Sequence, residues 1–163
     1  MILRQIVQRL VFGLGLLAAG SADAAAQAAI DVIPADGTTV SVALAGLPRH
    51  TVAADDHGTK IAFEGVLLRD VLARAGVPLG EKLHGPAALT SFVLATALDH
   101  YQVVFSIAEL DAGFTDQVIL LADRRDGKPL GAGTGPLQIV VPHEKRAGRW
   151  IRQVNRLEVR HAK

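Results

Sequence analysis

The stretch that decides the fold is residues 97–159, ALDHYQVVFSIAELDAGFTDQVILLADRRDGKPLGAGTGPLQIVVPHEKRAGRWIRQVNRLEV. It contains three apolar runs of strand length, at residues 101–105, 117–122 and 137–141. The uninterrupted run QVILLA is typical of a strand that is buried on both faces, so we expect a central strand there. Apolar and polar residues alternate imperfectly at residues 154–159, which predicts a closing strand.

Two short motifs in this stretch predict how its strands are connected. Ser106 and Glu109 have the spacing of a capping box, in which each side chain bonds the other residue's backbone N–H. This predicts a short helical turn ending near Gly113. The pair Asp126-Gly127 favours a type I′ turn, which predicts a tight hairpin after the central strand.

The segments before this stretch are shorter and more polar. Alternation at residues 38–45 predicts a half-buried strand, and residues 51–53, 60–63 and 91–95 also have strand character. Apolar residues at helical spacing predict one amphipathic helix at residues 66–75, followed by a Gly stop and a Pro, while residues 79–88 are predicted to form an irregular loop. With about seven short strands and one clear helix, the chain is predicted to be an α+β domain built on a β-rich, mixed or barrel-like sheet.

Residues 1–26 have the pattern of a signal peptide. Arg4 and Arg9 precede an apolar run at residues 10–19, and two small-residue cleavage sites follow, at residues 22–24 and 24–26. The run is short for a membrane helix, which needs about 20 residues, although an uncleaved anchor is the alternative. We expect export to the periplasm or medium, leaving residues 27–163 as a single domain without a membrane span.

Composition excludes several kinds of site. The chain contains no cysteine, which excludes disulfides, thiolate metal ligands and a cysteine nucleophile. After removal of the predicted signal peptide, basic and acidic residues are equal in number. Such a balance argues against a dedicated nucleic-acid-binding protein.

Several segments resemble, in the same order, the sulfite-oxidase-type molybdopterin-binding domain family. FEGVLLRDVL resembles the aromatic-x-G-V-x-L-x-D-x-L segment of that family, and the Asp99-His100-Tyr101 triplet resembles its D-G-Y strand start. The match continues in LLAD with GKPL, in GPLQIVVP and in RWI, at residues 120–130, 135–142 and 149–151. Together these segments span roughly residues 38–160, so the resemblance implies the fold of that family.

What the resemblance implies about chemistry is limited by two departures. Family enzymes hold molybdenum on a pterin dithiolene and on one cysteine thiolate from the loop before the helix, whereas residues 52–59 contain no cysteine. An arginine that helps the family to hold the pterin phosphate corresponds here to Gln138, which is neutral. We therefore expect a degenerate member of the family, in which molybdopterin is implied by resemblance alone and the cofactor is unknown.

Candidate binding residues lie in three segments, and no catalytic residue or metal ligand is predicted. A basic cluster lies beside His143 and Trp150 and consists of Lys145, Arg146, Arg149 and Arg152. It is either a binding site for a small anion or a solvent-exposed face beside the last strand. On the anion interpretation, loss of Arg149 abolishes binding and leaves folding nearly intact. Asp99, His100 and Tyr101 are pocket residues or an ordinary strand start.

Two further motifs have a functional and an ordinary interpretation. Gly131, Gly133 and Gly135, next to Gln138, form a cofactor-lining loop or a mobile connection between strands. Asp55-Asp56-His57 is a hard-metal site or a polar turn.

Three functions remain open on the sequence alone. The first is a binding module for a small anionic ligand or a periplasmic partner protein, without molybdenum redox chemistry. The second is a molybdopterin-dependent oxidoreductase, or a subunit of one, that binds the cofactor without a protein thiolate. The third is an accessory domain with no ligand.

Overall fold

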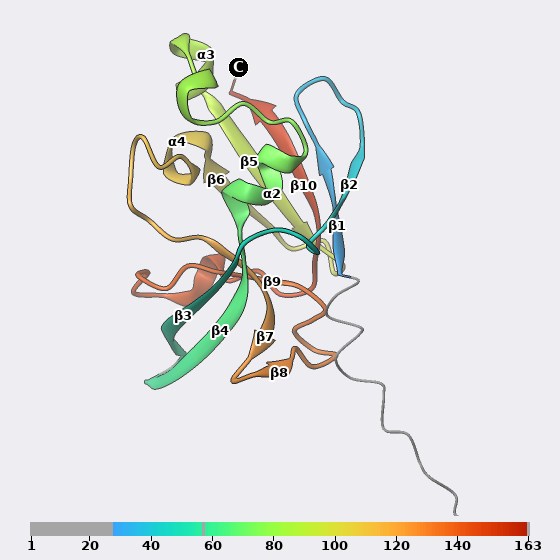
Figure 1. Cartoon of the computed structure of the whole chain (residues 1–163), viewed down its shortest axis with the longest axis vertical. Coiled ribbons are helices and arrows are strands. Elements are labelled where there is room, and N and C mark those ends of the chain that lie inside the picture. Colours follow the sequence, from blue (N-terminus) through green and yellow to red (C-terminus); the bar gives the residue numbers. More distant parts are fainter. Residues whose placement is uncertain (1–27, 57, 163) are drawn as a thin grey trace, which may run out of the picture.

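The computed structural model describes residues 28–56 and 58–162. The predicted signal peptide and His57 lie outside the described residues. The described chain has ten strands in two sheets and a few short helices, which confirms the predicted β-rich α+β class (Figure 1). None of the described helices has the length and apolar character needed to cross a membrane.

The first sheet is built from both ends of the described chain. Its strands, in spatial order, are β2 (Val40–Ala43), β1 (Ala29–Ile33), β10 (Val154–His161), β5 (Ser91–Ala97) and β6 (Gln102–Ser106). β1 runs parallel to β10, and the other neighbours are antiparallel. The predicted closing strand therefore lies in the middle of this sheet, since β1, which was not predicted, covers its other edge.

The second sheet is antiparallel and contains the predicted central strand. Its order is β3 (Arg49–Asp56), β4 (Thr59–Leu67), β7 (Leu120–Arg125) and β8 (Lys128–Pro129), and β9 (Gln138–Val140) also pairs with β7. In Figure 1 the two sheets lie one below the other, with the α-helices grouped around the upper sheet. Within the described residues neither sheet closes on itself, so the mixed-sheet description holds and the domain is not a closed barrel.

β7 is the buried centre of the second sheet, as the QVILLA run predicted. Its residues from Leu120 to Asp123 are all buried, and the strand pairs with β4 on one side and with β8 and β9 on the other. β4 approaches so closely that a Cβ on Gly65 would lie 2.1 Å from the Leu121 carbonyl oxygen. Only glycine permits this contact. The strand begins at Leu120 rather than Gln117 because the carbonyl of Ile119 accepts from Leu68 N at 2.9 Å, outside the ladder.

The turns and caps follow their sequence motifs closely. Ser106 Oγ accepts from Glu109 N at 3.1 Å and Glu109 accepts from Ser106 N at 2.7 Å, which confirms the capping box at the start of α4 (Ile107–Leu110). This helix ends at Leu110, before the predicted end near Gly113. Asp126 and Gly127 have φ values of 49° and 75°, both positive as a type I′ turn requires.

The helices differ from prediction mainly at their boundaries. The predicted helix at residues 66–75 is α2 (Leu68–Arg74), which begins later because Val66 and Leu67 remain in β4, paired with Leu121 and Leu120. The segment predicted as an irregular loop contains η1 (Gly80–Lys82) and the start of α3 (Gly85–Leu89). A further short turn, η2 (Ala147–Arg149), lies in the basic segment.

Candidate functional site

A cavity of about 530 Å³ lies where the second sheet, the β5–β6 hairpin and η2 meet. Its lining comes from segments that are far apart in sequence: Asp56 at the end of β3, Arg125 at the end of β7, Gln138 in β9 and Trp150 after η2. This volume is in the range of small-molecule sites. The fold therefore brings the ends of β3, β7 and β9 together with the segment after η2 at a single concave site.

Aromatic and charged groups pack together to form one wall of the cavity. The rings of Phe63 and Trp150 meet edge to face, with centroids 5.7 Å apart and planes at 86°. The guanidinium of Arg125 lies over the Phe63 ring at 5.7 Å and forms an ion pair with Asp56 at 3.1 Å. Trp150 donates its indole N–H to Val141 O at 3.0 Å. These contacts fix the wall and compensate the charge of Arg125 within the chain.

The β5–β6 hairpin forms the rim. Asp99 Oδ1 accepts from Tyr101 N at 3.0 Å, and the Tyr101 hydroxyl donates to Gly148 O at 2.9 Å, which ties the hairpin to η2. His100 has a φ of 69°, the left-handed conformation that ends a three-residue hairpin loop. Asp99 and Tyr101 line the cavity, whereas His100 does not.

The glycine-rich loop forms the opposite side of the cavity. Gly133 and Thr134 line the cavity. Gln153 holds this loop in place: its backbone N–H donates to Thr134 O at 2.9 Å, and its side-chain Nε2 donates to Ala132 O at 2.7 Å. Gly135 has a packing role, because a Cβ there would lie 2.8 Å from the Cβ of Leu130. The predicted loop therefore does border the site, through Gly133 rather than Gly135.

Two polar side chains of the lining have no protein partner. Within the described ranges, the amide of Gln138 and the guanidinium of Arg152 make no hydrogen bond or ion pair, whereas each other polar side chain of the lining makes at least one. Gln138 is only 5% exposed. Because no described side-chain nitrogen or oxygen is both sealed from solvent and unpartnered, its amide must open onto the cavity.

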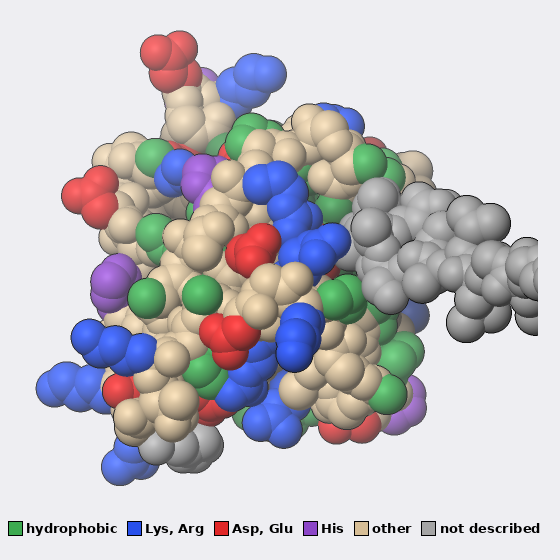
Figure 2. Space-filling model, turned by 60° about the horizontal axis from the view of Figure 1, so that its bottom comes forward, with side chains coloured by type: hydrophobic (Ala, Val, Ile, Leu, Met, Phe, Trp, Pro, Cys, Tyr) green, Lys and Arg blue, Asp and Glu red, His purple; other side chains and the backbone are tan. Residues whose placement is uncertain are grey.

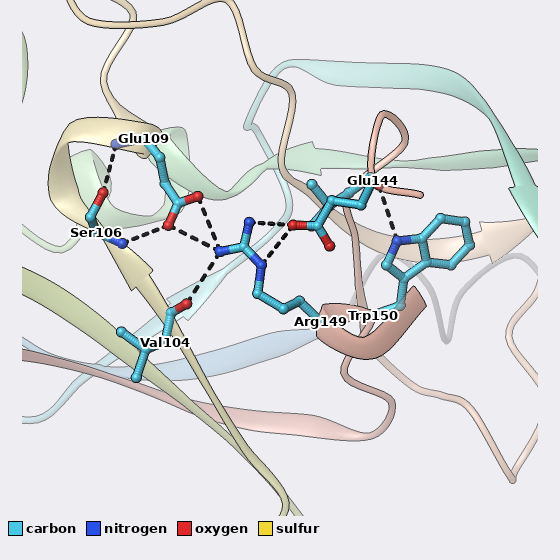
Figure 3. Close-up of polar contacts among 7 residues, drawn as sticks. Val104, Ser106, Glu109, Glu144, Arg149 and Trp150 are labelled. Carbon is cyan, nitrogen blue, oxygen red and sulfur yellow. Dashed lines mark hydrogen bonds and ion pairs between the residues drawn. The ribbon is translucent and has the colours of Figure 1, made fainter. Parts of the chain in front are cut away.

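Arg149 lies outside the cavity and is fully engaged by the chain itself (Figure 3). Its guanidinium donates to both carboxylate oxygens of Glu109 at 3.1 Å, to Glu144, and to Val104 O at 3.3 Å. It also lies 4.9 Å from the centre of the Phe105 ring. Burial lowers the pKa of Arg149, but the bonds to Glu144 and Glu109 outweigh it and leave that pKa raised.

The predicted basic cluster is therefore split between two environments. Arg152 and Trp150 line the cavity, whereas Arg149 and His143 border a separate groove that also includes Glu144. Lys145 and Arg146 are exposed and line neither. Arg149 is a bridge between η2 and α4, so the geometry gives no support to its interpretation as an anion-binding residue.

Among the candidate binding residues, the cavity thus contains Asp99, Tyr101, Gln138, Trp150 and Arg152, and their role in binding stays a prediction. Sequence reasoning missed Arg125, Thr134 and Gln153. A signal existed for Arg125, which comes immediately before the predicted Asp126-Gly127 turn and so ends the central strand. Nothing in the sequence pattern marks Gln153, whose φ of 50° places it in the left-handed region.

Comparison with known proteins identifies the family. The model of the oxidoreductase molybdopterin-binding domain matches residues 43–163. The chain belongs to this family. The fold is also similar to that in the crystal structure of the sulfane dehydrogenase SoxCD from Paracoccus pantotrophus, with a TM-score of 0.60 and 18% sequence identity. The similarity covers 83% of this chain and 38% of the SoxCD chain. No match was found among curated proteins.

The residues present do not fit a molybdenum centre held in the way that the family resemblance implies. The chain has no cysteine, and the β3–β4 hairpin offers the cavity Asp56, whose carboxylate is paired with Arg125. Within the described residues, no three His, Asp or Glu side chains gather in a group that could hold a metal ion. A soft thiolate is not replaced by a hard carboxylate without changing the electronics of the metal. Gln138 is likewise no substitute for an arginine facing a phosphate.

Proposed function

We propose that this domain is a binding module that takes a small anionic molecule into the cavity and does not carry out molybdenum redox chemistry. The observation that supports it is Arg152, a cation of the lining that has no ion pair within the described residues. A guanidinium is charged at every physiological pH and binds carboxylate or phosphate groups through two parallel hydrogen bonds.

The charges around Arg152 favour a small anion over a polyanion. Arg125 is compensated by Asp56, and Asp99 lies at the exposed rim, where it accepts from Tyr101 N. Figure 2 shows Lys and Arg side chains on the face that comes forward from the bottom of Figure 1, interspersed with Asp and Glu. A surface of mixed sign lacks the continuous basic footprint of a nucleic-acid-binding protein. Of the two arginines that line the cavity, Arg152 is thus the one without an ion pair within the described residues.

Export belongs to the same proposal. The arginines before the apolar run at residues 10–19 and the small-residue sites after it support a signal peptide that is removed at the membrane. We propose that the mature domain acts in the periplasm or outside the cell. Sequencing the N-terminus of the protein from fractionated cells tests this, since an intact Met1 in the membrane fraction would contradict it.

Family membership favours a second function. The match to the oxidoreductase molybdopterin-binding domain over residues 43–163 supports an oxidoreductase, or a subunit of one, that binds molybdopterin without a protein thiolate. The chain spans well under half of the SoxCD chain, so a larger assembly completed by a partner is compatible with this alternative.

Two measurements separate the proposals. The full chain, purified from its native compartment, is analysed for molybdenum and for pterin absorption, and its thermal unfolding is followed with acetate, phosphate and sulfate. Metal-free protein that these anions stabilise supports the binding module, because a ligand that binds only the native state raises the apparent stability. Stoichiometric molybdenum with a pterin would overturn it.

Matched variants assign the effect to the cavity. Arg152→Gln should abolish stabilisation by the anions, whereas Arg146→Gln, an exposed arginine outside the cavity, should leave it unchanged. An equal loss in both variants indicates non-specific charge screening and contradicts the proposal. No stabilisation of the unaltered protein by any anion would favour an accessory domain without a ligand.

A further inference from the structure

We propose that the ligand of this cavity carries an amide or lactam group beside its anionic group, and that Gln138 is the residue that recognises it. This inference rests on the proposed binding function and specifies its ligand class. It is carried by the combination of two unpartnered side chains in one cavity, a guanidinium at Arg152 and a buried carboxamide at Gln138.

The backbone holds Gln138 in place. It lies in β9, between the buried residues Leu137 and Ile139, and pairs with Ala122 of β7. The next residue, Ile139, donates its N–H to Ile151 O at 2.9 Å, which ties β9 to the segment that carries Arg152. The side chain therefore cannot leave the cavity by a shift of its strand, because that shift would break a buried ladder.

The other polar groups of the lining are already in use. The Tyr101 hydroxyl donates to Gly148 O and the Trp150 indole donates to Val141 O. The Gln153 amide donates to Ala132 O, and Thr134 Oγ1 donates to Gly131 O at 3.2 Å. Polar recognition of a ligand by unpartnered side chains is thus left to Gln138 and Arg152.

The chemistry of a carboxamide defines what it can recognise. A glutamine side chain presents a donating NH₂ and an accepting oxygen in one plane. A carboxylate only accepts, so it would leave the oxygen of the largely buried Gln138 side chain unpaired, which is unfavourable. A lactam or a cis amide offers a matching acceptor and donor. Arg152 then takes the carboxylate or phosphate of the same molecule.

A set of three probes with five-membered rings separates the two contributions. Pyroglutamate has a lactam and a carboxylate, cyclopentanecarboxylate has only the carboxylate, and 2-pyrrolidinone has only the lactam. Affinities for the full chain are measured by isothermal titration calorimetry. We expect pyroglutamate to bind about tenfold more tightly than cyclopentanecarboxylate, because only the lactam satisfies both groups of the amide.

Variants assign that preference to Gln138. Gln138→Leu should lower the affinity for pyroglutamate to that for cyclopentanecarboxylate, and leave the latter unchanged. Gln102→Leu, in which an exposed glutamine outside the cavity is altered, should retain the preference. Thermal unfolding checks that each variant is folded, and Gln138→Met replaces Gln138→Leu if that variant is not.

The outcomes distinguish this inference from the function on which it rests. If both carboxylates bind equally and binding depends on Arg152 alone, the amide inference is wrong and the binding module stands. A pyroglutamate preference that survives Gln138→Leu and Gln138→Met also overturns the inference. If neither carboxylate binds and acetate, phosphate and sulfate fail as well, the proposed function itself is wrong.

Discussion

Arg149 and Arg152 are three residues apart in one basic segment, yet the fold gives them opposite surroundings. Arg149 is held by Glu109 and Glu144 and lies against the Phe105 ring (Figure 3). Arg152 lines the cavity and has no ion pair within the described residues. An arginine whose donors are all used stabilises the chain, whereas one that is left unpaired beside a cavity is available to a ligand.

The difference arises from η2, the short turn that precedes Trp150. Gly148 and Ala147 of this turn face the cavity, while Arg149 reaches back to the start of α4 and to the Val104 carbonyl of β6. β6 is an edge strand of the first sheet, and the bond from Arg149 occupies one of its outward carbonyls. Covering an edge in this way protects it from pairing with another chain.

The largest predicted loss of stability is at Leu121, in the core, and the losses at the two arginines are compared with it. Leu121→Ala should destabilise the protein by about 2–5 kcal/mol, because it leaves a cavity at the buried centre of the second sheet. Leu121 is fully buried and pairs with both β4 and β9. Urea unfolding followed by circular dichroism measures the change. A loss under about 1 kcal/mol would show that β7 is not the centre of the core.

Removing Arg149 should cost less than that, but clearly more than removing a surface arginine. Arg149→Gln leaves Glu109 and Glu144 without their shared cation, and we expect a loss of about 1–3 kcal/mol, typical of hydrogen bonds to charged groups. This is the opposite of the sequence interpretation, in which loss of Arg149 left folding nearly intact. Urea unfolding of Arg149→Gln and of the exposed control Arg146→Gln checks it; equal stability of the two variants would contradict the bridging role.

Much of the fold could be predicted because its motifs act locally. The capping box at Ser106 and the Asp126-Gly127 turn are satisfied by residues close in sequence, and both form as predicted. β1 was missed because it finds its place beside β10, a strand from the other end of the chain, and no local motif marks that pairing. Val66 and Leu67 were assigned to the helix because their apolar character suits either element, and pairing with β7 decides in favour of the strand.

The site was less predictable, because its geometry depends on contacts between distant segments. The sequence singled out the basic residues and Gln138, but it contains nothing that distinguishes Arg149 from Arg152. That distinction requires the placement of Glu109, 40 residues away in sequence. Gln138 was interpreted mainly as a lost arginine, whereas the structure adds that its largely buried side chain has no protein partner and opens its amide onto the cavity.

Glu158 is one carboxylate between two arginines, Arg156 and Arg160, whereas Arg149 is one arginine between two carboxylates. We expect the contribution of Glu158 to stability to be small and to depend on pH. The hydrogen bond from Arg160, with a weaker contribution from Arg156, lowers the pKa of Glu158. A lowered folded-state pKa stabilises the protein above the unfolded pKa, and that stability is lost as the pH falls through the folded value. Both arginines are half exposed, so we expect less than about 1 kcal/mol.

Unfolding in urea at neutral pH and at about pH 3, below the ordinary glutamate pKa, measures this effect. Glu158→Gln should be less stable than the unaltered protein at neutral pH, and the difference should shrink in acid. Glu81→Gln, at an exposed position in η1, serves as the matched control. A difference that stays constant across the range would mean that Glu158 contributes through packing rather than through its charge.

The smallest stability effect is expected at Arg152, and it completes the comparison with Arg149. Arg152→Gln removes no ion pair or hydrogen bond within the described residues, so the free energy of unfolding should change by less than about 0.5 kcal/mol. Removing an unpaired cation from the cavity can even raise stability slightly, since nothing in the chain compensates its charge. The same urea experiment on Arg149→Gln and Arg152→Gln, run without added anions, gives the difference directly. A loss at Arg152 as large as that at Arg149 would show that Arg152 also serves the fold, and the assignment of this side chain to a ligand would then lose its basis.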